Sequence, residues 1–129
     1  SKEILALKKY IITKYIIEKE ILFDAENTEI KDLLSRGMEF YVNGNYQDAI
    51  SALIIVNEKA KTKNYRIKSN QFLGIINFIL GNKEEAVKYF HNAFKLDFKD
   101  NLSEDLFSQK IVDFYNELKI KYRLENEEW

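Results

Sequence analysis

Apolar residues recur along most of the chain at intervals of three and four residues, which is the period of an amphipathic helix. This recurrence is interrupted twice by a Gly-Asn pair, first at Gly44 and Asn45 and then at Gly81 and Asn82. The apolar pattern resumes after each pair. Because glycine ends a helix and asparagine begins one, each pair indicates a tight turn between two helices. The pattern therefore predicts two helical hairpins.

The two hairpins read as copies of one repeat. Aligned on their Gly-Asn pairs, they are displaced by 37 residues (81 minus 44). Residues that match at this offset are Gly37 and Gly74, Gly44 and Gly81, Asn45 and Asn82, Ala49 and Ala86, and the conservative pairs Asp48 and Glu85, Ile50 and Val87, Leu53 and Phe90. The small residues allow antiparallel helices to approach closely. The Asn-x-x-acid spacing predicts a capping box, in which the Asn side chain accepts the third-residue N–H.

Both flanks of the repeat carry further helical patterns. Residues 2–23 show an apolar arc wider than one surface helix usually has, formed by Ile4, Leu5, Leu7, Ile11, Ile12, Tyr15, Ile16, Ile21 and Leu22. Residues 106–124 carry large apolar residues at helical spacing, with Ser108 as the expected cap. Since stacked repeats need about three units to bury their faces, we expect the flanks to cover the ends of the pair.

These patterns together predict an all-α fold of about six helices in three antiparallel layers. A chain of 129 residues is ordinarily one domain, so we expect a single domain over residues 1–129. The expected parts are an N-terminal capping helix over 1–28, a first unit over 29–61, a second unit over 62–98, and a C-terminal capping helix and tail over 99–129.

The repeated residues resemble a known family. Leu33, Gly37, Phe40, Gly44, Tyr46, Ala49, Leu53 and Val56 in the first unit, and Leu73, Gly74, Gly81, Ala86, Phe90 and Ala93 in the second, fall in order on the pattern of the tetratricopeptide repeat. Asn77 stands where that family prefers an aromatic residue. The resemblance implies a short solenoid of stacked hairpins. Because the offset exceeds the family's period by about three residues, we expect a longer inter-repeat turn within residues 60–66.

The charge balance and residue content argue against several classes of function. The net charge is -1, from 20 basic and 21 acidic residues interspersed along the chain, which disfavours nucleic-acid binding. No apolar run reaches the ~18 residues of a membrane span. His91 is the single histidine, cysteine is absent, and the glycines form no phosphate-binding loop. We therefore expect a non-catalytic protein with no cofactor and no metal ion.

The resemblance also implies which side chains face inward from the first helix of each unit. They are mostly apolar, and the predicted partner-binding groove consists of Leu34, Met38, Tyr41, Val42, Phe72, Ile75, Phe78 and Ile79, with Ser35 and Gln71 beside them. One explanation of an apolar groove is that the first or the C-terminal helix of the chain fills it. The other is that an amphipathic helix or extended segment of another protein binds there. The sequence leaves both open.

Two functional hypotheses follow. The first is an interaction module that binds, and stabilises, a partner protein through this groove. The alternative is a structural domain that pairs with a second copy through the helix from Ile4 to Leu22, giving a homodimer. Residues 95–118 are also similar to the segment that follows the repeats in some bacterial cell-envelope tetratricopeptide proteins. That similarity favours the bacterial cell envelope or periplasm over the cytoplasm.

Overall fold

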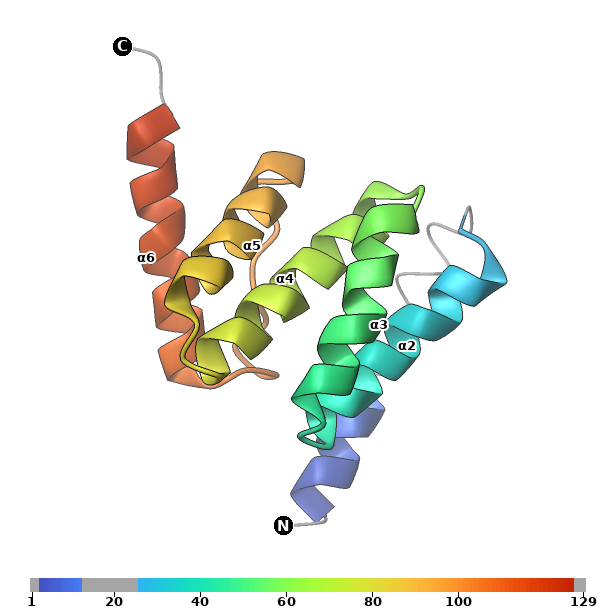
Figure 1. Ribbon diagram of the computed structural model, residues 1–129. Helices are drawn as coiled ribbons and strands as arrows, with labels where there is room; N and C mark the ends of the chain where they lie inside the picture. The colour runs from blue at the N-terminus through green and yellow to red at the C-terminus, as the bar shows by residue number, and fades with distance from the viewer. Residues whose placement is uncertain (1–2, 13–25, 127–129) are drawn as a thin grey trace.

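The computed structural model describes residues 3–12 and 26–126 of the chain, and every regular element in these ranges is a helix (Figure 1). The helices are residues 3–12, α2 (Thr28–Val42), α3 (Tyr46–Lys59), α4 (Lys63–Ile79), α5 (Lys83–Leu96) and α6 (Gln109–Asn126). The expected all-α fold with six helices is confirmed. Residues 13–23 of the helix expected at the N-terminus lie outside the described residues.

The two Gly-Asn turns have the same backbone geometry. Gly44 and Gly81 have φ angles of 79° and 85°, the left-handed conformation that glycine adopts without a steric penalty. In the first turn Gly44 N donates to Tyr41 O at 3.1 Å and Asn45 N donates to Phe40 O at 2.8 Å. The second turn has the same two bonds 37 residues later, also at 3.1 and 2.8 Å. Each turn is therefore a Schellman motif that ends one helix and aims the chain back along it.

The expected capping boxes do not form. Asn45 and Asn82 occupy the N-cap positions of α3 and α5, but neither side chain accepts a capping hydrogen bond. Their ψ angles are 69° and 71°, imposed by the Schellman turn, whereas a capping residue usually has an extended backbone. Asn27, with ψ 156°, shows the usual geometry: its Oδ1 accepts from Ile30 N at 2.9 Å. The prediction had the right residues at the helix starts and the wrong hydrogen bond.

The two upstream glycines allow the helices of each hairpin to touch. A Cβ atom on Gly37 would lie 2.8 Å from the Leu53 side chain, and one on Gly74 would lie 2.5 Å from Cδ1 of the Phe90 ring. Real Cβ atoms essentially never approach that closely. Leu53 and Phe90 are themselves matched at the repeat offset, so both hairpins pack by the same contact, a large side chain of the second helix resting on a glycine of the first.

The connection between the hairpins is short. We expected a longer turn within residues 60–66, but α3 and α4 are joined by residues 60–62 alone. Two of the additional residues lie in α4, which has 17 residues against 15 in α2. The buried carboxylate of Glu26 accepts hydrogen bonds from Lys61 N at 2.9 Å and Thr62 N at 2.8 Å. A negative charge at the start of α4 also complements the helix dipole. The expectation of a longer turn between the hairpins was therefore wrong.

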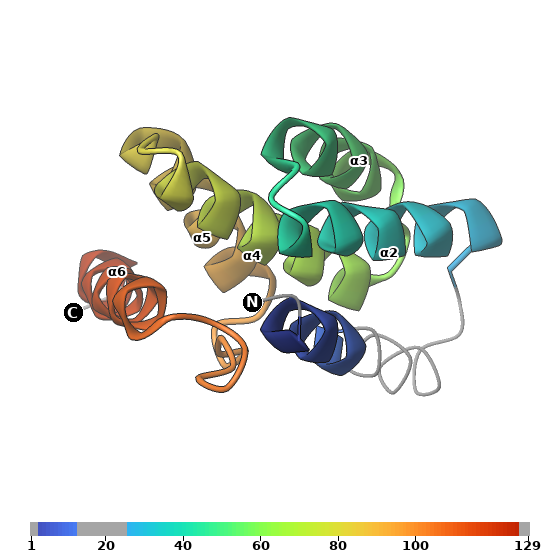
Figure 2. The ribbon, with the colours of Figure 1, turned by 90° about the horizontal axis from the view of Figure 1, so that it is seen from below.

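The hairpins α2–α3 and α4–α5 lie side by side, α6 packs along α5, and helix 3–12 lies under α2 (Figures 1 and 2). Residues 97–108, called the connection below, run from α5 to α6 across the inner side of the hairpins (Figure 2).

As predicted, Ser108 caps α6: its Oγ accepts from Ile111 N at 3.4 Å. Leu106 and Phe107, expected at the start of the helix, belong instead to the connection.

Candidate functional site

The predicted groove lies in the core of the described chain. Six of its eight side chains are buried, namely Leu34, Met38, Tyr41, Val42, Phe72 and Ile75. Phe78 is half-buried against Phe114 of α6, with ring centroids 4.5 Å apart, and Ile79 is 40% exposed. Of the two flanking polar positions, Ser35 is exposed and Gln71 is buried. The first helices of the two units therefore bring the six buried side chains into one cluster, but not on an open surface, and Ile79 lies outside that cluster.

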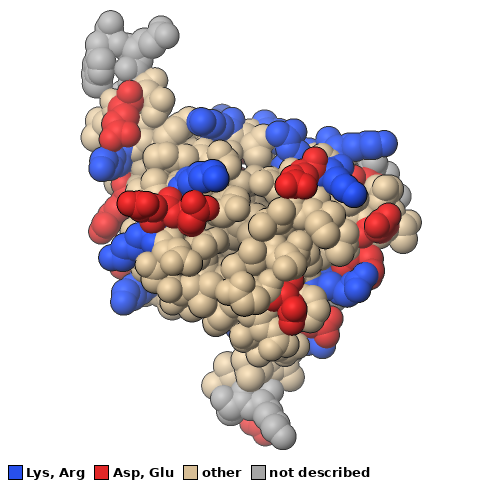
Figure 3. All heavy atoms as spheres, in the orientation of Figure 1, with Lys and Arg blue, Asp and Glu red and all other residues tan. Residues whose placement is uncertain are grey.

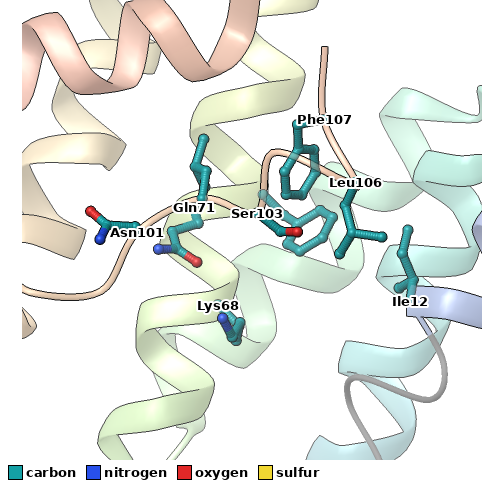
Figure 4. A pocket seen from close by; sticks show the side chains of 9 residues that line it. Ile12, Lys68, Gln71, Asn101, Ser103, Leu106 and Phe107 are labelled. Atoms are coloured by element: carbon teal, nitrogen blue, oxygen red, sulfur yellow. The ribbon is translucent and has the colours of Figure 1, made fainter. Parts of the chain in front are cut away.

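The connection fills the groove. Leu102, Leu106 and Phe107 are all buried and belong to the same apolar cluster as the groove residues. The Phe107 ring packs edge-on against Phe72, with centroids 5.5 Å apart, and lies 6.4 Å from the ring of Tyr41. Ile12 of the N-terminal helix lies close to Leu106 at one end of this packing (Figure 4). We expected either the first or the C-terminal helix, or another protein, to fill the groove. The residues that fill it belong instead mainly to the connection, which precedes α6, with Ile12 at one end.

A polar network holds the connection in place. Lys68 Nζ lies 3.7 Å from Asp100 Oδ2, and Gln71 Nε2 donates to Tyr115 Oη at 3.3 Å and approaches Asp100 Oδ2 at 3.5 Å. Tyr115 Oη in turn donates to the backbone oxygen of Asp100 at 3.1 Å. Both α4 and α6 therefore bind the same residue of the connection, and the hydrogen bonds satisfy polar groups that packing has removed from water.

The network has perturbed proton affinities but no space for a substrate. Burial lowers the pKa of Lys68 below its ordinary value, and the nearby Asp100 carboxylate opposes that change. Burial raises the pKa of Tyr115 to about 12, which the hydrogen bond from Gln71 partly opposes. The cavity beside Lys68 and Gln71 measures only about 10 Å³ (Figure 4). Since that is about the space of one water molecule, the geometry supports a role in holding the connection.

Tyr41 gives the packed groove a measurable pH dependence. Burial raises its pKa to about 12, from 10.0 in an exposed side chain. Between these values the unfolded chain releases the proton while the folded chain retains it, so stability is full below pH 10 and falls as pH rises towards 12. In Tyr41→Phe, the free energy of unfolding is expected to fall by about 2 kcal/mol less between pH 10 and pH 12 than it does in the native protein. Urea unfolding of both proteins across this pH range measures it; equal losses would show that Tyr41 ionises freely in the fold.

Helix 3–12 turns its lysines towards the body of the protein and most of its large apolar side chains towards solvent, the opposite of the usual arrangement for a surface helix. Its two described lysines lie towards the body: Lys9 Nζ pairs with Glu39 Oε1 at 2.6 Å, and Lys8 Nζ lies 5.2 Å from the centre of the Tyr41 ring. Ile12 is buried, but the other large apolar side chains are exposed, with Ile4 at 66%, Leu5 at 45%, Leu7 at 59%, Tyr10 at 64% and Ile11 at 36%. Exposed apolar side chains at this density are typical of an interface.

Groups that carry chemistry are sparse elsewhere in the described residues. His91 is half-buried beside Tyr122, with ring centroids 5.2 Å apart, and burial lowers its pKa. Within residues 3–12 and 26–126, no cluster of three His, Cys, Asp or Glu side chains is arranged to bind a metal ion. None of the helices described combines the length and hydrophobicity that a bilayer crossing needs.

Comparison with known proteins gave no relative, since no family model, curated protein or solved structure matches the chain.

Sequence reasoning missed the residues that close the groove. Leu102 stands between polar residues with no helical period around it, so no local pattern marks it as core. Phe107 was counted with the following helix, although the cap at Ser108 already placed it outside. Lys68 and Glu26, both buried, were not singled out because their partners lie far away in the sequence. The cap at Ser108 was the one local signal among these residues, because it places Phe107 before the helix.

Proposed function

We propose that the chain is a non-catalytic protein–protein interaction module, built on two tetratricopeptide-like repeats, that binds and stabilises another protein. The repeat assignment is supported by two turns with the same backbone hydrogen bonds and by two glycine contacts at equivalent positions. A partner could reach Leu34, Met38 or Phe72 only if the connection left the groove, because these side chains are buried beneath it. The binding surface proposed here is therefore on the outside of the molecule.

The observation that carries the proposal is the outward face of helix 3–12. Leu7 and Tyr10 leave more than half of their surface in water, next to Ile4 and Ile11, while the polar residues Lys8 and Lys9 contact the body. Burying apolar area contributes about 25 cal/mol per Å², so a helix exposed in this way gains free energy when an apolar surface covers it. An amphipathic helix or extended apolar segment of a partner protein fits that face.

A homodimer is the second candidate, favoured by the spacing of the same residues. Ile4, Leu7 and Ile11 follow one another at three and four residues, the spacing by which two helices pack along a shared seam. A two-fold interface buries the same patch of both subunits, and this exposed apolar stripe could serve as that patch. Sedimentation at micromolar concentration separates the candidates, because a protein that stays monomeric throughout that range does not form the homodimer.

Leu7→Glu combined with Tyr10→Glu is expected to abolish partner binding and leave the fold intact, since both side chains are largely exposed. The measurement is affinity capture from a lysate of the source organism with native and variant proteins, followed by mass spectrometry. Circular dichroism and thermal unfolding report whether the variant is folded. Retention of the same proteins by the folded double variant would refute this binding surface.

A matched control is available on α6. Ile120 and Leu124 are exposed by 63% and 57%, so Ile120→Glu with Leu124→Glu makes the same change in charge at two similarly exposed side chains of another helix. The control variant is expected to retain the captured proteins. If both double variants lost them equally, the loss would reflect net charge rather than the face of helix 3–12.

A further inference from the structure

A second surface, independent of helix 3–12, lies between the end of α5, the start of the connection and the last turns of α6. It is an open groove of about 770 Å³, called the α5–α6 groove here. That volume is within the range of natural binding sites, roughly 300–1,000 Å³. Figures 1 and 2 show α6 running beside α5 with the connection leading between them. Unlike the predicted groove, this one is not filled by the described part of the chain.

Four cationic side chains line the α5–α6 groove. Lys95 and Lys99 come from the end of α5 and the start of the connection, and Lys119 and Arg123 come from α6. Each pair is separated by four residues, so the positive charges follow both walls. No Asp or Glu is among the described residues that line the groove. Burial lowers the pKa of Lys119, and the nearby carboxylates of Asp100 and Asp97 oppose that change, so part of the positive charge is offset. The four cations of the groove contrast with the face of the molecule shown in Figure 3, where basic and acidic side chains are interspersed.

The floor of the groove is aromatic. Phe94 lies 5.4 Å from Tyr122 and 6.1 Å from Phe98, and the rings of Phe98 and Tyr122 are stacked at 6.2 Å. Lys119 Nζ lies 4.9 Å from the centre of the Phe98 ring and donates to Asn101 Oδ1 at 2.6 Å. These contacts hold one of the four cations in position before any ligand arrives, which reduces the entropy lost on binding.

We propose that the α5–α6 groove binds a short acidic segment of another protein that carries an aromatic or large aliphatic side chain. The carboxylates pair with the cations of the two walls, and the apolar side chain covers the exposed part of the aromatic floor. Charge complementarity of this kind favours rapid and selective association. The proposal does not depend on the face of helix 3–12, so either surface can fail without the other.

The charge distribution favours a peptide over a nucleic acid. Proteins that bind nucleic acid generally carry a basic patch or stripe, because neutralising several phosphates supplies much of the affinity. The α5–α6 groove has four cations, and the whole chain has a net charge of -1.

The test uses a fluorescently labelled Glu-Phe-Glu-Glu peptide and fluorescence anisotropy with the full chain. Lys95→Gln combined with Lys99→Gln, both at exposed positions, is expected to weaken binding about fivefold to tenfold. The matched control is Lys83→Gln with Lys110→Gln, two exposed lysines outside the groove that give the same change in net charge. The control is expected to bind as the native chain does, and higher salt is expected to weaken binding.

Three further ligands decide between occupants. A Gln-Phe-Gln-Gln peptide is expected to lose binding because it lacks carboxylates, and a Glu-Ala-Glu-Glu peptide is expected to bind more weakly because it leaves the floor uncovered. Equal binding of the acidic peptide by groove and control variants would overturn the proposal. So would tighter, groove-dependent binding of oligodeoxythymidine, which would indicate a nucleic-acid site. Self-association of the native chain that Lys95→Gln with Lys99→Gln removes would assign the groove to a second copy.

Discussion

Phe107→Ala is expected to lower the free energy of unfolding by about 3 kcal/mol, the usual cost of emptying a buried phenylalanine site. The ring is buried, packs edge-on against Phe72 and lies 6.4 Å from the ring of Tyr41. Its removal leaves a cavity lined by side chains that are held rigidly by α2 and α4, so collapse is limited. Urea unfolding followed by circular dichroism measures the loss.

A second aromatic residue of the connection provides the comparison. Phe98 is half-buried and packs on Phe94 and Tyr122, away from the groove. Because it buries less surface, Phe98→Ala is expected to cost about 1–2 kcal/mol. If Phe107→Ala cost less than Phe98→Ala, the connection would not be what closes the groove.

Gly74→Ala is expected to destabilise the protein by about 2 kcal/mol, although alanine in a helix usually stabilises by about 1 kcal/mol relative to glycine. The new Cβ would lie 2.5 and 2.9 Å from two atoms of the Phe90 ring. That ring is fully buried and packs edge-on against Tyr115 at 5.0 Å, so it has little room to move. The steric cost therefore exceeds the gain in helix propensity.

The repeat itself supplies the control for this substitution. Gly37→Ala places a Cβ against the Leu53 side chain, which can change rotamer more easily than a buried ring. It is therefore expected to cost less than Gly74→Ala. In a double-mutant cycle, Phe90→Leu should recover part of the loss caused by Gly74→Ala. The new Cβ at position 74 would then meet a leucine, as a Cβ at position 37 does. No coupling between Gly74→Ala and Phe90→Leu would contradict the contact.

Local sequence signals predict the two Gly-Asn turns and the helices on either side of them. The Gly-Asn pairs mark both Schellman turns because only glycine adopts the positive φ angle there without strain. The matched Gly37 and Gly74 indicated close helix packing because a missing Cβ has that consequence wherever helices meet. These features depend on a few neighbouring residues, which is why the sequence reveals them.

The state of the groove depended on contacts between distant residues. Six of the eight residues expected on the inner face are buried, and they are covered by Leu102 and Phe107. These two residues lie 23 and 28 positions beyond the end of α4 (102 minus 79 and 107 minus 79), in a stretch with no helical period. The polar anchor of that stretch, Lys68 with Asp100, joins residues 32 positions apart (100 minus 68). No local pattern encodes such a pairing, since either residue alone resembles ordinary surface.

The most direct measurement is site-specific photo-crosslinking from helix 3–12. The chain has 0 Cys, so a benzophenone attached to Leu7→Cys labels one site, and Leu124→Cys on α6 is the control. In a lysate of the source organism, the account predicts a discrete heterologous adduct from position 7 that position 124 does not give. An adduct of twice the chain mass would assign the face to a homodimer. No adduct from position 7, or the same adducts from both positions, would contradict the proposed function.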